Sequence, residues 1–271
     1  MTDYIVAIPS YKRYDEITKK TLPTLIDGGV PKEIIHIFVA NKTEEKLYRE
    51  KLDPKTYGEI VVGEKGITNQ RIFINKYFPV GKRIVSLDDD VEQLQKLKGA
   101  NFKLPKNPNK KKTINKDKSK NKLIKINNVD KFFRDAFTLL NKTGLNLWGV
   151  YPTNNPFFMY NKITTDLRFI IGVCFGFINH HDSKLYPSKQ LKGKSDYHQT
   201  ILFYLKDKGV LRFNNVTTKT VFKAPGGMGP KRQKVYKHAQ EYLVKKYPNI
   251  VKPKTRLDGT PEVRLIPNPE I

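Results

Sequence analysis

The stretch from Arg83 to Asp90, RIVSLDDD, joins a run of β-forming apolar residues directly to three consecutive carboxylates. Because side chains alternate along a strand, we expect Asp88 and Asp90 to project together and Asp89 to project to the opposite side. Two neighbouring carboxylates are unfavourable without a cation, and Mg²⁺ or Mn²⁺ prefers such oxygen ligands, usually completed by phosphate groups. The stretch therefore predicts a divalent-metal site. The alternative is an acidic turn that caps a helix over residues 91–97.

The first ninety residues alternate between short apolar runs and amphipathic stretches. Such alternation predicts parallel strand–helix–strand units, and hence an α/β fold whose sheet is covered on both faces. Ligands of open α/β sheets bind beyond the carboxyl ends of the strands, which is where the three aspartates lie. Strands are predicted at residues 4–8, 34–40, 59–62 and 83–87, and helices at residues 15–26, 44–52 and 68–77.

A Lys- and Asn-rich segment follows over residues 98–125, with almost no apolar residues. We predict a mobile inserted loop, which is either a plain solvated loop or a contact to phosphate groups. Ser195 suits the N-cap of a later helix, and Gly209 suits its end. The remaining pattern predicts helices at residues 129–140 and 231–247, strands at residues 147–151 and 216–222, a buried strand or strand pair at residues 169–178, and an extended Pro-rich tail.

The chain has 271 residues, enough for one large domain or two small ones with a sizeable core. Its 51 Lys and Arg residues against 26 Asp and Glu residues give a net charge of +25, which favours binding to a polyanion such as nucleic acid. Hydrophobic residues make up 38%, fewer than in most globular domains, but the 11% of aromatic residues argues against a wholly disordered chain.

Cys174 is the single cysteine, which excludes an internal disulfide framework and a multi-cysteine zinc site. It lies in an apolar run, where a cysteine is usually inert as a nucleophile. The N-terminus lacks the pattern of a secretory signal, and the longest apolar run, residues 169–178, is too short to span a bilayer. We therefore expect a soluble cytoplasmic protein without a membrane partner.

Two further segments near the first and third strands carry candidate ligand-binding residues. Tyr11 could stack on a base and Arg13 could meet a diphosphate, although the segment could also be a plain turn before a helix. Gly63 and Gly66 precede a helix that contains Arg71, so backbone N–H groups there could approach phosphate. The alternative for the second segment is an ordinary loop with a surface arginine.

A general base is predicted in the sequence Ser195-Asp196-Tyr197-His198. The helix dipole favours an ionised Asp196, which suits proton acceptance from an alcohol, and His198 is the second candidate. The alternative is a simple helix cap. Further on, the glycine loop at residues 226–230, followed by Lys231 and Arg232, has the composition of a lid over phosphates, or of a plain Gly/Pro turn.

In combination these features resemble the GT-A glycosyltransferases. The resemblance rests on Ile8-Pro9-Ser10-Tyr11-Lys12-Arg13 at a strand end, a second strand ending at Asn41, the helix start with Asn69 and Arg71, and the aspartates after the fourth strand. Within these enzymes the chain looks most like the TET/JBP-associated glycosyltransferases, which occur in phages, large DNA viruses and some eukaryotes.

The similarity covers residues 3–97 well and residues 148–232 less specifically. It implies a single α/β domain of the GT-A fold, Rossmann-like and nucleotide-sugar-binding, with a central mixed, mostly parallel sheet. The implied organisation is a nucleotide-sugar-binding half (1–97), a Lys-rich mobile insertion (98–127), an acceptor-binding half with the catalytic helix and the glycine-rich loop (128–247), and an extended tail (248–271).

The resemblance also implies a reaction: transfer of a sugar, with inversion, from a nucleotide sugar such as a UDP-sugar to a hydroxyl group, with Mn²⁺ or Mg²⁺ as cofactor. Asp196 matches the place of the acidic base, although Lys194-Ser195-Asp196 stands where many GT-A enzymes have an acidic pair. The implied metal ligands are Asp88, Asp90 and a late histidine, His238. The implied donor-binding residues are Pro9, Ser10, Tyr11, Arg13, Asn41, Lys65, Gly66, Asn69, Arg71, Asp88, Asp89 and Gly227.

The acceptor implied by the resemblance is a hydroxymethylated pyrimidine such as 5-hydroxymethylcytosine, in DNA rather than RNA, and the basic charge independently favours nucleic acid. A base in a duplex would have to be flipped out to react. The candidate acceptor-binding residues are Trp148, Tyr151, Phe157, Phe158, Tyr160, Cys174 and His198, of which the aromatic ones could instead form core and one loop. Three other functions stay open: a GT-A enzyme for glycans or protein, a nucleotidyltransferase, and a non-catalytic nucleic-acid-binding relative.

Overall fold

The computed structural model describes residues 4–109, 121–220 and 232–270 of the chain. Its strands are β1 (Tyr4–Pro9), β2 (Ile35–Val39), β3 (Glu59–Val62), β4 (Arg83–Leu87), β5 (Gln93–Leu97), β6 (Leu123–Lys125), β7 (Leu147–Tyr151), β8 (Ile163–Thr164), β9 (Cys174–Ile178), β10 (Leu211–Lys219), β11 (Val251–Thr255) and β12 (Pro261–Leu265). Its α-helices are α1 (Tyr14–Lys19), α2 (Thr21–Asp27), α3 (Lys42–Lys51), α4 (Ile67–Tyr77), α5 (Val129–Thr143), α6 (Ser195–Asp207) and α7 (Arg232–Lys246), with 3-10 turns η1 (Lys32–Ile34) and η3 (Ser183–Leu185).

The described strands form a ten-stranded sheet in the order β3-β2-β1-β4-β9-β7-β10-β5-β6, with β8 beside β10. The neighbours β3, β2, β1 and β4 are parallel, as are β7 and β10, whereas β9, β5 and β8 run against them. The carboxyl ends of β1, β2, β4 and β7 therefore share one edge of a mixed sheet. This is the predicted fold class.

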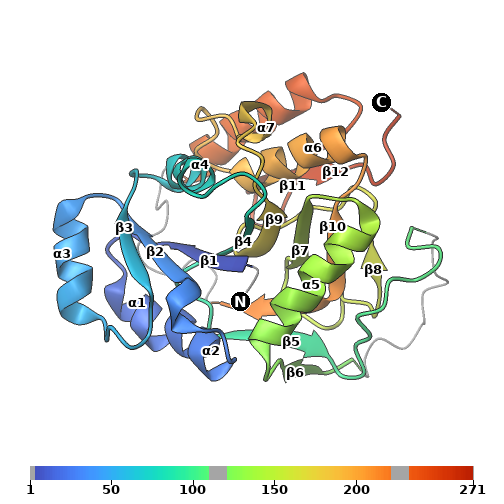
Figure 1. Ribbon diagram of the computed structural model, residues 1–271. Coiled ribbons are helices and arrows are strands. Elements are labelled where there is room, and N and C mark those ends of the chain that lie inside the picture. The colour runs from blue at the N-terminus through green and yellow to red at the C-terminus, as the bar shows by residue number, and fades with distance from the viewer. Residues whose placement is uncertain (1–3, 110–120, 221–231, 271) are drawn as a thin grey trace.

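Helices cover both faces of this sheet (Figure 1). The helices α4, α6 and α7 gather on one face, and α1, α2 and α5 lie on the other. Right-handed crossovers explain this distribution, because the sheet order reverses after β3 and the following helix must cross back over β1. In the described part of the chain no helix has the length and apolar composition needed to cross a membrane.

The core beneath α5 requires a glycine at position 176. Trp148 is fully buried among the aromatic rings of Phe132, Phe137 and Phe213. A Cβ atom at Gly176 on the neighbouring strand would lie 2.3 Å from the indole Nε1 atom of Trp148. The indole therefore fits against β9 only because residue 176 has no side chain.

Several sequence-based expectations about elements are corrected by the structure. The expected single helix over residues 15–26 is two helices, which break at Lys20. The alternative helix over residues 91–97 is wrong, because Gln93–Leu97 is strand β5 and pairs antiparallel with β10. Buried Leu94 and Leu97 are three residues apart, a spacing that also suits a helix, and only the partner strand decides between the two.

The remaining differences concern segments after residue 98. Part of the expected loop over residues 98–125 is strand β6, which pairs with β5, and residues 110–120 lie outside the described residues. The strand expected over residues 169–178 begins only at Cys174, and the strand expected at 216–222 begins earlier, at Leu211. The tail forms the antiparallel hairpin β11–β12, which packs on α7.

Candidate active site

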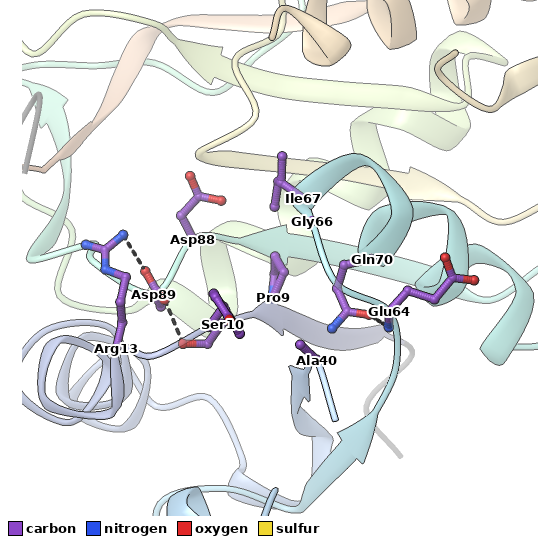
Figure 2. Close-up of a pocket in the computed structure, with 11 residues that line it drawn as sticks. Pro9, Ser10, Arg13, Ala40, Glu64, Gly66, Ile67, Gln70, Asp88 and Asp89 are labelled. Atoms are coloured by element: carbon purple, nitrogen blue, oxygen red, sulfur yellow. Dashed lines mark hydrogen bonds and ion pairs between the residues drawn. The ribbon is translucent and has the colours of Figure 1, made fainter. Parts of the chain in front are cut away.

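An open cleft of about 300 Å³ lies at the carboxyl edge of the parallel strands (Figure 2). Its walls come from the ends of β1, β2 and β4 and from the loop before α4. Seven of the eleven lining residues were predicted as donor-binding: Pro9, Ser10, Tyr11, Arg13, Gly66, Asp88 and Asp89. The other four lining residues are Ala40, Glu64, Ile67 and Gln70.

The loop after β1 is bonded directly to the aspartates after β4. Ser10 Oγ donates a hydrogen bond to Asp89 Oδ2 across 2.6 Å. The Arg13 guanidinium pairs with Asp89 at 3.1 Å and with Asp90 at 2.8 Å, so one cation bridges two consecutive carboxylates. Figure 2 shows Asp89 between Arg13 and Ser10, with a dashed line to each, whereas Asp88 projects away from them.

This arrangement corrects the expected alternation of the three aspartates. Asp89 and Asp90 share Arg13, while Asp88 pairs with Arg71 of α4, whose Nη2 atom lies 3.1 Å from Asp88 Oδ1. The strand ends at Leu87, and the residues after it form a turn. The strict two-residue period of side-chain direction therefore does not extend to them.

Burial raises the pKa of both cleft-lining aspartates. Desolvation raises the pKa of Asp88 to about 6; the charges of Asp90 and Asp196 add to the effect, and Arg71 opposes it. Desolvation raises the pKa of Asp89 to about 7, against the Ser10 hydrogen bond and Arg13. The two arginines, Arg13 and Arg71, therefore do not fully compensate the negative charge of the three aspartates.

The chemistry of this cluster fits a divalent cation that is completed by a ligand. Within residues 4–109, 121–220 and 232–270, no three His, Cys, Asp or Glu side chains are grouped as a closed metal cage. A hard cation that binds through one or two carboxylates and substrate phosphates does not require such a cage. Asp88 and Asp90 supply oxygen ligands of this kind, and side-chain exposures of 31% and 14% leave both accessible.

Asp196 lies near this cluster, on the second residue of α6. It accepts backbone hydrogen bonds from Tyr197 at 3.0 Å and from Gly172 at 3.3 Å. The carbonyl oxygen of the same Gly172 accepts from Arg71 Nη2 at 2.6 Å, so Arg71 links Asp196 to Asp88. The three residues therefore form one electrostatically coupled group at the edge of the cleft.

The pKa of Asp196 differs from the expectation based on the helix dipole. Burial raises the pKa, and it outweighs the opposing effects of Arg71 and of the two backbone N–H groups. A carboxylate with a raised pKa is a stronger proton acceptor than an ordinary aspartate. The cap is also different: Lys194, in the left-handed region at φ 62°, precedes the helix, and Ser195 is already its first residue.

The backbone of the loop after β1 is held by side chains of α3 that the sequence analysis missed. Tyr48 OH contacts Ser10 Oγ at 2.7 Å and accepts from the Arg13 N–H at 3.0 Å. Buried Glu44 accepts from the Lys12 N–H at 2.8 Å, where Lys12 has a φ of 56°. The spacing of Glu44 and Tyr48, four residues apart on one helix face, was the signal in the sequence.

Gln70 is the most connected of the cleft residues that were not predicted. Its Oε1 accepts from the Glu64 N–H at 2.7 Å, and its Nε2 donates to the Val39 carbonyl at 3.0 Å. The side chain thereby fastens the loop before α4 to the end of β2. No residue-type rule would have singled out a glutamine for this role.

Four predicted donor residues in the described part of the chain do not line the cleft: Asn41, Lys65, Asn69 and Arg71, of which Arg71 pairs with the cleft residue Asp88. Asn41 caps α3 by accepting from the Glu44 N–H at 2.9 Å. Asn69 donates to the Lys65 carbonyl, and Lys65 Nζ lies 5.5 Å from the ring centre of Tyr11, so these two remain near the cleft mouth. Gly227 lies outside the described residues. The metal-ligand candidate His238 is exposed on α7.

Three acceptor-binding candidates are corrected by their burial. Trp148 and Cys174 are both 0% exposed in the core, and burial raises the pKa of the Cys174 thiol, which keeps it protonated. His198 is 2% exposed; its Nδ1 accepts from the Ser188 N–H, and its Nε2 lies 2.9 Å from Tyr247 OH. In this structure all three side chains are packed in the interior rather than exposed to solvent.

The other acceptor candidates remain accessible. Phe157 and Phe158 are 57% and 52% exposed, and their rings meet edge to face, 5.2 Å between centroids. Tyr151 and Tyr160 are half-buried beside Arg212. One described end of the Lys-rich segment reaches this loop, because Asn121 donates to the Pro156 carbonyl.

No known family's sequence profile matches the chain, and no curated protein matches it. Among solved structures, it is similar to glucosyl-3-phosphoglycerate synthase from Mycobacterium tuberculosis in complex with Mn²⁺, UDP-glucose and phosphoglyceric acid. The TM-score is 0.50 at 9% identity, over 98% of this chain and 87% of that chain. This likeness and the observed sheet confirm the predicted α/β fold of the GT-A type.

Two further solved structures are similar to the chain. Mannosyltransferase PcManGT from Pyrobaculum calidifontis, in complex with GDP-Man and Mn²⁺, has a TM-score of 0.49 and 13% identity, over 91% of this chain and 64% of that chain. S. aureus TarS 1–349 has a TM-score of 0.46 and 14% identity, over 89% of this chain and 65% of that chain. The chain thus spans slightly less than two thirds of the length of each.

Proposed function

We propose that this protein is a metal-dependent glycosyltransferase that moves a sugar from a nucleotide sugar, a UDP-sugar, to a hydroxyl group. The observation that carries the proposal is the coupling of Asp88 and Asp196 through Arg71 at the edge of the cleft. One of these carboxylates belongs to a cation-binding cluster, and the other is a buried proton acceptor. A sugar transferase needs both groups within reach of one anomeric carbon.

The donor is bound by the cleft residues. Asp88 and Asp90 would hold Mn²⁺ or Mg²⁺, which would neutralise negative charge on the departing diphosphate. The Tyr11 ring, 37% exposed at the cleft wall, suits stacking on the nucleobase. The Mycobacterium tuberculosis synthase that shares the fold was solved with Mn²⁺ and UDP-glucose, a donor of the class proposed here.

Asp196 acts as the general base. It accepts the proton of the acceptor hydroxyl while that oxygen forms a bond to C1 of the sugar and the bond from C1 to the diphosphate oxygen breaks. Attack from the face opposite to the diphosphate inverts the anomeric configuration. The products are the glycosylated acceptor, the nucleoside diphosphate and protonated Asp196.

For the acceptor we propose a hydroxymethylated pyrimidine in DNA, as in the TET/JBP-associated enzymes. The net charge of +25 and the exposed Phe157–Phe158 pair support a nucleic-acid acceptor. A pyrimidine in a duplex has to leave the base stack first, at a cost of about a few kcal/mol. With Trp148 in the core, stacking on the extruded base is left to accessible rings such as Phe157.

The test is incubation of the full chain and Mn²⁺ with a panel of UDP-sugars and DNA that contains either 5-hydroxymethylcytosine or cytosine. We expect release of UDP and a mass gain of one sugar on the hydroxymethylated DNA only. UDP release with glycan acceptors but not with DNA would identify a glycan transferase. No UDP release with any acceptor, together with no binding of UDP, would overturn the proposal of a transferase.

A further inference from the structure

Arg212 on β10 is a buried cation whose described partners are all uncharged. The residue is 7% exposed, and among the described residues no carboxylate forms an ion pair with it. Its Nε donates to Asn214 Oδ1 at 2.7 Å, and its Nη1 donates to the Phe169 carbonyl at 3.4 Å. The side chain of Tyr160 is also near enough to influence the pKa of Arg212. A guanidinium group has five N–H donors, so these neutral partners do not compensate its charge.

Two more polar side chains lie near this guanidinium. Its carbon atom lies 5.2 Å from the ring centre of Tyr151, and Arg168 is near enough to lower the pKa of Arg212, in addition to the larger effect of burial. Arg168 pairs with Asp166 at 2.8 Å and is therefore already neutralised. The cluster of Tyr151, Tyr160, Arg168 and Arg212 keeps one uncompensated positive charge.

A buried unpaired charge is costly, and proteins rarely keep one without a function. Because Tyr151, Tyr160 and Arg168 are only half-buried, the cluster is reachable from solvent although Arg212 itself is covered. Two guanidinium groups and two phenol groups are together the donors that a tetrahedral oxyanion requires, and guanidinium binds phosphate in a bidentate manner.

The cluster is connected to the proposed base. The Phe169 carbonyl that contacts Arg212 belongs to a residue whose ring stacks on Tyr197, with 3.7 Å between centroids and 8° between planes. Tyr197 directly follows Asp196 on α6. Arg212 also lies on the sheet face opposite to the aromatic core, because its neighbour Phe213 packs against Phe132 beneath α5. The cluster and Asp196 therefore lie on the same side of the sheet.

We propose that Arg212, Arg168, Tyr151 and Tyr160 form a subsite that binds a phosphate group of the acceptor. The identification of the ligand as the acceptor rests on the proposed function, whereas the phosphate site itself is inferred from the cluster alone. The subsite is separate from the donor cleft, since none of its four residues lines that cleft. It would fix the acceptor by its phosphate and leave the hydroxyl free to approach Asp196.

The test is calorimetric titration of inorganic phosphate into the full chain saturated with UDP and Mg²⁺, so that phosphate cannot occupy the donor cleft. We expect saturable binding to the wild type and about tenfold or weaker binding to Arg212→Met and Arg168→Gln. The exposed Arg49→Met is the matched control and should bind phosphate as the wild type does. UDP affinity, measured separately, should change less than twofold in all three variants.

The outcomes separate the two proposals. Phosphate binding that is absent, or equal in the wild type and both cluster variants, would overturn the subsite. If Arg212→Met does not fold, Arg168→Gln on the half-exposed arginine decides the question alone. Phosphate binding in a protein that fails to bind UDP would overturn the transferase and leave the subsite in place.

A competition experiment identifies the source of the phosphate group. A DNA dinucleotide carries a phosphodiester, and a sugar monophosphate carries a phosphomonoester. Displacement of inorganic phosphate by the dinucleotide would show that the subsite holds a nucleic-acid backbone, and displacement by the sugar monophosphate would show a small phosphorylated acceptor. Failure of both to displace inorganic phosphate would contradict the assignment to an acceptor.

Discussion

Arg71 donates a hydrogen bond to Asp88 across 3.1 Å and at the same time holds the Gly172 carbonyl at 2.6 Å. The N–H of that glycine donates to Asp196, so one guanidinium group lies beside both carboxylates of the proposed reaction. Arg71 is 8% exposed, and a Cβ at Gly172 would lie 2.6 Å from its Nη1 atom. The arginine thus occupies space that only a glycine leaves free.

Replacement of Arg71 by methionine should therefore change the protonation of the site. Without the cation the pKa values of Asp88 and Asp196 should rise, since Arg71 lowers both. We expect the acid limb of the pH–rate profile to move to higher pH and kcat at pH 7 to fall by about tenfold or more. The exposed Arg49→Met should leave the profile in place. An unshifted acid limb in Arg71→Met would contradict this coupling.

Replacement of Asp196 by asparagine removes the proton acceptor and keeps the shape of the side chain. Loss of a general base should lower kcat by about 10²- to 10⁴-fold, with little change in the affinity for the donor. The measurement is UDP release under saturating donor, with Asp135→Asn on the exposed face of α5 as the control. Activity within threefold of the wild type would exclude Asp196 as the base.

Replacement of Asp90 by asparagine tests the cation site. Because a neutral amide is a weaker ligand for a hard cation, we expect Mn²⁺-dependent UDP binding to weaken by about tenfold, which is 1.4 kcal/mol. Calorimetry with and without Mn²⁺ measures this change, and Glu50→Gln on the surface of α3 is the control. UDP affinity that is independent of Mn²⁺ in the wild type would show that no such cation takes part.

His198 should make the fold sensitive to acid. Burial, and to a lesser extent Lys246, lowers the pKa of His198 from 6.5 to about 4. Between these two pKa values the folded state binds fewer protons than the unfolded state. The free energy of unfolding is therefore unaffected by His198 above pH 6.5 and decreases as the pH falls toward 4. The loss is about 3 kcal/mol at pH 4 by linkage.

Urea unfolding at pH 7.5 and at several values down to pH 4 measures this effect. In His198→Asn the decrease in the free energy of unfolding from pH 7.5 to pH 4 should be smaller than in the wild type by about 3 kcal/mol. His238→Gln, on the exposed side of α7, should follow the wild type. Identical pH dependence in wild type and His198→Asn would show that other groups cause the acid sensitivity.

The ion pair of Lys194 with Glu262 should hold the C-terminal hairpin against the start of α6. Their side chains are 3% and 7% exposed, and Arg256 also pairs with Glu262. Removing one charge of a buried pair costs about 3–5 kcal/mol, so Glu262→Gln should be strongly destabilising. The double variant with Lys194→Met should recover part of that loss in urea unfolding, and the exposed Arg264→Gln should be neutral. A double variant no more stable than Glu262→Gln would contradict the pairing.

Much of residues 4–97 could be predicted because the signals there are local. An apolar run that ends in carboxylates identifies a strand end, and the alternation of strands and helices before it restricts the topology to parallel units. Seven residues that line the cleft were among those that the resemblance to GT-A glycosyltransferases implied for donor binding. The segments after residue 128 were less predictable, since aromatic residues such as Trp148 and Phe157 look alike in a sequence, although Trp148 lies in the core and Phe157 is exposed.

The sequence by itself determined that the chain has an α/β fold, that three carboxylates follow its fourth strand, and that its charge is strongly positive. Only the tertiary structure decided which arginine neutralises which aspartate, and that Arg212 is buried with no acidic partner among the residues that the structure describes. The physical reason is the sequence separation of the residues that interact. Strand and helix periodicity depends on residues a few positions apart, whereas the pKa and the partners of a charged side chain depend on groups that are brought to it from distant segments.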